Sequence, residues 1–189
     1  MLKNKLLFCV VLPMLFVFVT IFFPKSGFCY TSCVKGEIYK DSQKRFEVTC
    51  PSNEIDFDIL GIAFKDSKNY SYYLVRALDT PPVNLKKELT IENVLSDIKS
   101  SLSAKAEIEV LKQEKTTYDN HEAMNFIFVL KTSDPMYYYT RLIRSDNYVF
   151  WIYMAMPSGP DSLIVTNENE AIMAPALADK FLNSLKILK

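Results

Sequence analysis

Apolar and polar residues alternate along much of the chain with a period of two, which is typical of β-strands that bury one face. The alternation is clear in residues 46–50 and 55–59, and a longer aromatic-rich segment of the same kind spans residues 70–78. After Thr90, whose side chain is suited to capping a helix N-terminus, the period becomes that of a helix. The apolar positions that define this helix are Ile91, Val94, Leu95, Ile98 and Leu102.

Two long β-hairpins are predicted in the second half of the chain. One spans residues 108–131 and turns at Asp119-Asn120, and the other spans residues 137–156 and turns at Asp146-Asn147. Within both hairpins, apolar side chains occupy odd and even positions alike. A sheet with two apolar faces has to be covered on both sides, so we expect helices above and below it.

The C-terminal part of the chain is predicted to add one more helix and one more strand. The helix spans residues 170–184, with Pro175 in its first turn or at a kink, and the strand spans residues 185–188. Together the elements predict an α+β fold in which an antiparallel sheet of about six strands is flanked by helices, as an α-β-α sandwich. About 160 residues are enough for one domain with a single continuous core.

The N-terminal segment determines where the domain is expected to work. Residues 6–23 are almost entirely apolar and follow Lys3 and Lys5, a pattern typical of a secretory signal and just long enough for an uncleaved anchor. In either case the positive residues keep the N-terminus in the cytoplasm and the rest of the chain crosses the membrane. We therefore expect residues 1–29 to be a signal peptide or signal anchor, and residues 30–189 to be a single exported domain, periplasmic or secreted.

Cysteine usage fits export. Cys9 and Cys29 fall in the predicted signal, which leaves Cys33 and Cys50 as a pair in a compartment where disulfides form. We predict a disulfide between them, which would close a loop of about 17 residues and stabilise the fold by roughly 3 kcal/mol. The alternative is a redox couple of Cys29 and Cys33, but its spacing is one residue longer than the reactive C-x-x-C arrangement.

Composition excludes several classes of function. Without the predicted signal the chain has 19 basic and 22 acidic side chains and no basic stripe, so neither nucleic acid nor an anionic membrane surface is expected as a partner. Contact with a membrane is expected only through the N-terminal segment. Four glycines argue against a glycine-rich phosphate loop, and a single histidine excludes multi-histidine metal sites. We therefore expect no cofactor.

Two groups of residues could still carry chemistry. One group consists of three carboxylates on one strand face, from Glu54, Asp56 and Asp58. Calcium prefers such oxygen ligands, but the spacing matches no known calcium-binding loop. Like charges that prevent an edge strand from pairing with another chain explain the pattern well. His121 stands beside Glu122, although neighbours on a strand point to opposite sides. An envelope hydrolase that uses these carboxylates, or His121 with Glu122, is therefore the alternative to a binding function.

Two runs of tyrosines are the most unusual feature of the exported part. One contains Tyr70, Tyr72 and Tyr73, and the other is Tyr137, Tyr138 and Tyr139. Tyrosine is favoured both at protein interfaces and at seams where helices pack on sheets. If the two runs lie together at one end of the sheet, they form a binding patch, and we take Tyr137, Tyr138 and Tyr139 as its candidate residues.

Three of the arginines, Arg76, Arg141 and Arg144, fall on predicted strands. Arg141 and Arg144 are an odd number of residues apart, so their side chains point to opposite faces of a strand and cannot bind one ligand together. Ion pairs at the ends of the sheet are their expected role.

The order of elements resembles the PsbP-like family, the family of the extrinsic subunit of photosystem II, whose α-β-α sandwich also occurs in a nuclear Ran-binding protein. The pieces that carry the resemblance are residues 90–102, 119–126, 137–156 and 181–186, and the likeness covers most of residues 40–188. Asn120 stands where such sequences often have a glycine, and asparagine tolerates the left-handed conformation. The resemblance implies an accessory or binding role with a protein partner; a carrier of a small apolar ligand remains a further alternative.

Overall fold

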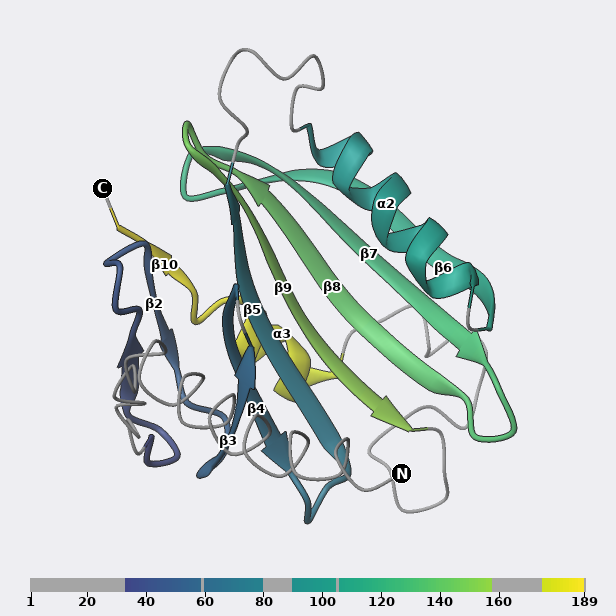
Figure 1. Cartoon of the computed structure of the whole chain (residues 1–189), viewed down its shortest axis with the longest axis horizontal. Coiled ribbons are helices and arrows are strands. Elements are labelled where there is room, and N and C mark those ends of the chain that lie inside the picture. The colour runs from purple at the N-terminus through teal and green to yellow at the C-terminus, as the bar shows by residue number, and fades with distance from the viewer. Residues whose placement is uncertain (1–32, 59, 80–89, 105, 158–174, 189) are drawn as a thin grey trace, which may run out of the picture. The chain divides into compact units, whose positions relative to one another are not determined.

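The computed structural model describes residues 33–58, 60–79, 90–104, 106–157 and 175–188, all within one compact unit. These residues form two antiparallel sheets and two helices (Figure 1). The elements in chain order are β1 (Ile38–Lys40), β2 (Phe46–Thr49), β3 (Glu54–Asp58), β4 (Gly61–Asp66), β5 (Ser71–Asp79), α2 (Ile91–Ser103), β6 (Glu107–Tyr118), β7 (His121–Lys131), β8 (Met136–Arg144), β9 (Tyr148–Pro157), α3 (Ala176–Leu182) and β10 (Lys186–Ile187).

The large sheet has seven strands in the order β3-β4-β5-β9-β8-β7-β6, and the small sheet has the order β1-β2-β10. Both predicted hairpins are present as β6-β7 and β8-β9. Asp119 and Asn120 have φ of 48° and 64°, as a two-residue hairpin turn with both central residues left-handed requires. Asn120, which stands where sequences of the PsbP-like family often have a glycine, therefore adopts the left-handed conformation that the turn needs.

Helix α2 covers one face of the large sheet, where it packs against β6, β7 and β8. Thr90 caps it as predicted, since its Oγ1 accepts a hydrogen bond from the Asn93 amide at 3.2 Å. The helix buries Ile91, Val94, Leu95 and Ile98 against the even-numbered residues of β7, with Leu142 and Val149 from the neighbouring strands. This apolar cluster accounts for one of the two predicted apolar faces.

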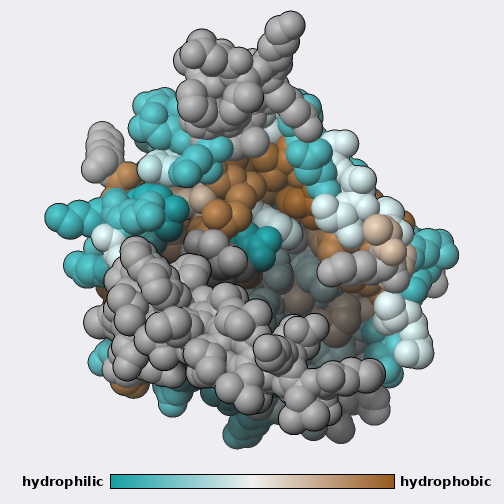
Figure 2. Space-filling view, viewed as in Figure 1, coloured by the Kyte–Doolittle hydropathy of each residue, from teal (hydrophilic) through white to brown (hydrophobic). Residues whose placement is uncertain are grey.

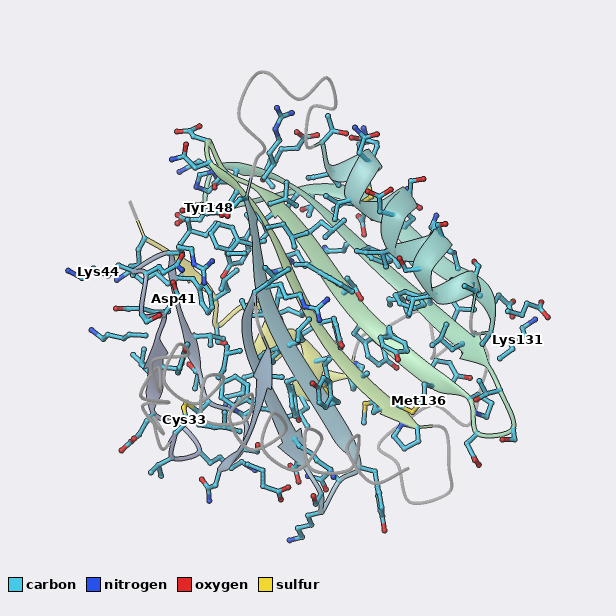
Figure 3. The ribbon with its side chains drawn as sticks, in the orientation of Figure 1. Cys33, Asp41, Lys44, Lys131, Met136 and Tyr148 are labelled. Atoms are coloured by element: carbon cyan, nitrogen blue, oxygen red, sulfur yellow. A yellow bond between two sulfur atoms is a disulfide. The ribbon has the colours of Figure 1, made fainter. Side chains whose placement is uncertain are left out.

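The opposite face is covered by α3 together with the small sheet. Phe181 and Leu182 of α3 and Phe46 and Val48 of β2 belong to one buried cluster with residues of β5, β8 and β9. Cys33 and Cys50 lie in the same cluster and are joined by the predicted disulfide, with their Cα atoms 6.1 Å apart (Figure 3). The disulfide therefore ties the start of the domain to the small sheet.

The structure corrects the prediction in three respects. The large sheet has seven strands instead of about six, because β4 was not predicted; its run Ile62-Ala63-Phe64 is buried throughout and does not alternate. Residues 46–49 and 186–187 do form strands, but these pair with each other in a separate sheet. The second face is consequently covered by a sheet and a helix rather than by helices alone.

Gly61 shows why β4 can lie where it does. A Cβ atom at this position would lie 1.8 Å from the carbonyl oxygen of Val75 on the adjacent strand β5. Only glycine permits so close an approach, so this one of the four glycines is required by strand pairing.

Some expectations concern parts of the chain outside the described residues. These are the apolar run at residues 6–23, the predicted signal at residues 1–29, and the first turns of the predicted helix at residues 170–174. Helix α3 is described from Ala176, after Pro175. Across the described ranges, neither α2 nor α3 has the length and apolar character needed to span a membrane.

Candidate functional site

The candidate tyrosine run on β8 is divided between the two faces of the large sheet, because successive side chains on a strand point in opposite directions. Tyr139 is completely buried, and Tyr137 packs beside it against the cluster on the α3 face. Tyr138 points to the other face and stacks on Phe128, with ring centroids 4.7 Å apart. The three residues therefore do not form one surface.

One member of each tyrosine run does, however, reach a shared surface. We call this surface the aromatic row and define it as Tyr72, Arg76, Tyr138, Trp151 and Tyr153, all on the α2 face of the large sheet. Tyr153 lies at its centre, with its ring centroid 6.4 Å from that of Tyr72, 5.5 Å from that of Tyr138 and 5.2 Å from that of Trp151. The guanidinium carbon of Arg76 lies 5.4 Å from the centre of the Trp151 ring.

Strand register explains how the rings meet. Ala155 pairs with Tyr72 on one side and with Tyr138 on the other, while Tyr153 lies two residues before it on the same face. Because alanine is small, the rings of both tyrosines can lean across it toward Tyr153, and Ala155 itself is buried. Arg76 pairs directly with Trp151, which places the guanidinium over the indole as a cation–π contact.

The aromatic row lies on β5, β8 and β9, and its members Tyr138 and Trp151 pack against the apolar cluster that α2 covers. All five side chains are half-buried. Figure 2 looks onto this face and shows a hollow with apolar side chains above it and hydrophilic side chains to the left and right. Tyrosine, tryptophan and arginine are the residues that most often dominate the binding energy of protein interfaces. The two tyrosine runs in the sequence indicated a binding surface, and one residue of each run, Tyr72 and Tyr138, lies on it. Trp151 and Arg76 could not be assigned to this surface without knowledge of the strand pairing.

Arg141 points to the opposite face and is buried, with 8% of its surface exposed. Its Nε donates to Asn125 Oδ1 at 2.7 Å, and one terminal nitrogen donates to Asn183 Oδ1 at 2.8 Å and to the Leu182 carbonyl at 3.2 Å. The guanidinium carbon also lies 4.8 Å from the centre of the Tyr118 ring. Burial lowers the pKa of Arg141, while Tyr118 and Asp179 raise it. Arginine nevertheless stays protonated in proteins.

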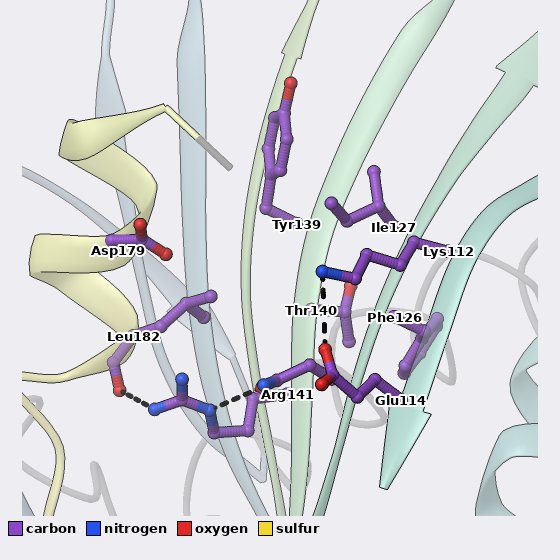
Figure 4. A pocket seen from close by; sticks show the side chains of 10 residues that line it. Lys112, Glu114, Phe126, Ile127, Tyr139, Thr140, Arg141, Asp179 and Leu182 are labelled. Carbon is purple, nitrogen blue, oxygen red and sulfur yellow. Dashed lines mark hydrogen bonds and ion pairs between the residues drawn. The ribbon is translucent and has the colours of Figure 1, made fainter. Parts of the chain in front are cut away.

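These contacts differ from the ion pairs expected for the arginines. Arg141 forms no ion pair with any described residue; it instead holds the C-terminal end of α3, where a cation is favoured by the exposed carbonyl groups. Arg141 also lines a cavity of about 230 Å³ between α3 and strands β6 to β8 (Figure 4). The charged groups around the cavity are Lys112, Glu114 and Asp179, and the first two form an ion pair at 3.3 Å.

The residues of the hydrolase hypothesis do not converge. Asp56 and Asp58 lie on β3 and His121 begins β7, and these strands are separated by four others, so five spacings of about 4.8 Å put them roughly 24 Å apart. β3 is an edge strand, as the charge-protection explanation of its carboxylates requires. No group of three potential metal ligands is found in the described ranges.

His121 lines a different cleft, of about 860 Å³, beside Ser145 and Asp146. A serine, a histidine and an aspartate in one cleft invite comparison with a catalytic triad. Ser145 Oγ, however, donates to the Tyr148 carbonyl and accepts from the Tyr148 amide, both at 3.2 Å. Within the described ranges, no hydrogen bond joins Ser145 to His121, so the serine serves the turn between β8 and β9.

Comparisons with known proteins identify the fold. No protein-family model matches the chain, and no curated protein matches its sequence. Among solved structures, the chain is similar to the Ran-binding protein Mog1p of Saccharomyces cerevisiae, with a TM-score of 0.56 and 10% identity over 80% of this chain and 94% of that one. It is also similar to cyanobacterial PsbP from Synechocystis, with a TM-score of 0.54 and 12% identity over 87% of this chain and 99% of that one.

A third similar structure comes from Bacteroides thetaiotaomicron, with a TM-score of 0.52 and 12% identity over 82% of this chain and 50% of that one. At these identities the comparisons establish a shared fold. The predicted resemblance to the PsbP-like fold is confirmed.

Proposed function

We propose that this chain is an exported accessory domain that binds a protein partner through the aromatic row and performs no chemistry itself. The observation that carries the proposal is the aromatic row, where Tyr72, Tyr138, Trp151 and Tyr153 meet around one point on the sheet with Arg76 beside them. Rings of this kind offer a large contact area at a low cost in side-chain entropy, and interface hot spots are enriched in these three residue types.

The fold supports a protein as the partner. Mog1p, which has this fold, is by name a Ran-binding protein. PsbP, which also has this fold, belongs to the family of an extrinsic subunit of photosystem II. The printed name of Mog1p and the family of PsbP both favour a protein partner for this fold.

Export is supported by the sequence together with the disulfide. Residues 1–29 have the pattern of a signal peptide or anchor, and Cys33 and Cys50 form a bond that is typical of oxidising compartments. We propose that residues 30–189 lie outside the cytoplasm, periplasmic or secreted, and that residues 6–23 provide the membrane contact if the signal is not cleaved.

The binding proposal is tested by comparing two tyrosine substitutions. Tyr153→Ala removes the centre of the aromatic row, and Tyr70→Ala removes a tyrosine that is 77% exposed at the turn before β5. Because central aromatic residues commonly contribute 2 kcal/mol or more, we expect Tyr153→Ala to weaken partner affinity by at least about tenfold and Tyr70→Ala to leave it unchanged. If thermal melting shows that both variants are folded and both bind the partner with equal affinity, the proposed surface is refuted.

Mass spectrometry under non-reducing conditions tests export separately. For the protein isolated from its own membrane and envelope fractions, we expect either the mass of residues 30–189 less two hydrogens or the full-length mass with the disulfide intact. A full-length chain with free thiols in the cytoplasmic fraction would contradict export while leaving the binding test unaffected.

A further inference from the structure

The cavity beside Arg141 has the features of a ligand site that the aromatic row does not explain. Arg141 lies on β8, an interior strand of the large sheet, and burying a charge is unfavourable unless the group is paired. All the acceptors that the described residues give it are neutral: two asparagine side chains and one backbone carbonyl. A buried arginine that has no carboxylate among its described hydrogen-bond acceptors is unusual, and it is the starting point of the inference.

The hydrogen bonds of Arg141 leave one side of the guanidinium open. Its five N–H groups include one on Nε and two on each terminal nitrogen. Nε uses its donor on Asn125, and Nη1 has two acceptors, on Leu182 and Asn183. Nη2 has no acceptor among the described residues. Figure 4 shows the guanidinium at the edge of the cavity, with one nitrogen directed away from both hydrogen bonds.

The size and charge of the cavity limit what could bind there. A volume of about 230 Å³ corresponds to roughly eight water molecules, which suits a small acid or one acidic side chain. Lys112 adds a second positive charge at the rim, although it is ion-paired with Glu114. Glu114 and Asp179 at the rim disfavour a doubly charged phosphate more than a singly charged group.

We propose that this cavity binds a carboxylate, with Arg141 Nη2 as the principal donor and Lys112 as a second cation at the rim. The carboxylate can belong to a small free acid or to an acidic side chain of a protein. The site lies on the α3 face, opposite the aromatic row, and its existence does not depend on the proposed function.

The direct test is to titrate the full-length protein with sodium acetate and follow the Nε–H resonance of Arg141 by NMR. We expect a saturable shift with a dissociation constant on the order of 1 mM, as a ligand of so few atoms can give. Sodium chloride at matched ionic strength serves as the blank. Absence of a saturable shift, or stronger binding of methyl phosphate than of acetate, would overturn the carboxylate assignment.

Three substitutions separate a binding site from a structural clamp. Arg141→Lys keeps the charge but loses the planar donor set, so acetate should bind at least about tenfold more weakly. Asp179→Asn removes a like charge from the rim without touching the contacts of Arg141, so acetate should bind about fivefold more tightly. Arg144→Lys changes an arginine on the same strand that points to the other face, and binding should not change.

Asp179→Asn keeps the test decisive if Arg141→Lys fails to fold, because unchanged or weaker binding in this folded variant contradicts the proposal. Acetyl-Gly-Asp-Gly-amide distinguishes the two sources of the carboxylate. Binding of acetate alone identifies a small acid as the ligand, whereas binding of both compounds identifies an acidic side chain of a partner.

Discussion

The two helices close the two faces of the large sheet by different means. Helix α2 has 13 residues, a side-chain cap at Thr90 and four buried apolar residues, and its buried contacts with the sheet are apolar. Its polar contacts with β6, Lys115 to Glu92 at 3.0 Å and Lys99 to Gln113 at 3.4 Å, are exposed. Helix α3 has seven residues and no side-chain cap, and polar contacts at its C-terminal end supplement three buried apolar residues. Arg141 and Tyr118 supply those contacts by donating to the backbone of residues 182, 183 and 185.

This difference shows how helix length changes the means of attachment. A helix of seven residues is marginal by itself, so its position depends on the groups that hold its ends. We call the buried apolar residues of α2 the apolar seal, and the hydrogen bonds from Arg141 and Tyr118 to the end of α3 the polar clamp. Attachment by the apolar seal is spread over many side-chain contacts, whereas attachment by the polar clamp depends on a few hydrogen bonds. The polar contacts also leave Arg141 Nη2 without an acceptor among the described residues, beside the cavity on the α3 face.

The largest expected effect comes from breaking the apolar seal. Leu95→Ala in α2 deletes a buried side chain, which should lower the free energy of unfolding by about 3 kcal/mol in a denaturant titration. Ser96→Ala, at the exposed neighbouring position, should change it by less than about 0.5 kcal/mol. A loss below about 1 kcal/mol for Leu95→Ala would mean that α2 does not seal this face.

A smaller loss in the free energy of unfolding is expected when Arg141, the central residue of the polar clamp, is replaced. Arg141→Met keeps much of the volume but leaves Asn125, Asn183 and the Leu182 carbonyl without their donor, so we expect a loss of about 2 kcal/mol. Hydrogen exchange should accelerate in α3 and remain slow in α2. Equal acceleration in both helices would show that the two faces are not independently attached.

Tyr118→Phe tests the clamp at a single atom. It removes the hydroxyl that donates to the carbonyls of Asn183 and Leu185 but keeps the ring over Arg141, so a loss of about 1 kcal/mol is expected by chemical denaturation. Tyr70→Phe is the matched control, because the Tyr70 side chain is exposed. Identical stability of the two variants would remove Tyr118 from the account.

The smallest effect should have the opposite sign. The Tyr139 hydroxyl is buried without a hydrogen-bond partner in the described part of the chain, and burial raises its pKa to about 12. Tyr139→Phe should therefore raise the free energy of unfolding by roughly 0.5 kcal/mol. A loss greater than about 1 kcal/mol would mean that this hydroxyl does have a partner.

Local patterns in the sequence predicted the local structure well. Thr90, the spacing of Ile91 to Leu102 and the Asp119-Asn120 turn each encode an element through neighbours in sequence, and all three predictions are confirmed. The β4 strand was missed because Ile62-Ala63-Phe64 is buried on both faces and shows no period. Pairing of β10 with β2 could not be predicted, since alternation gives a strand's faces but not its neighbour.

The candidate sites were harder to predict for the same reason. The prediction of one patch from Tyr137, Tyr138 and Tyr139 overlooked that consecutive residues on a strand point to opposite faces. That rule still does not show which rings from other strands join Tyr138. Arg141 finds its partners 16 and 42 residues away, and neither separation has a period that a sequence pattern could show. The disulfide was predictable because Cys9 and Cys29 fall in the predicted signal, which left Cys33 and Cys50 as one pair.

Photo-crosslinking in the native cells tests the central claim most directly. A photoreactive phenylalanine derivative replaces either Tyr153 in the aromatic row or Tyr70 outside it, and adducts are quantified after irradiation under native expression. The account predicts one dominant protein adduct from Tyr153, formed outside the cytoplasm, and little or none of it from Tyr70. The same adduct in equal amount from both positions, or none from Tyr153 in a folded protein, would contradict a partner site on the aromatic row.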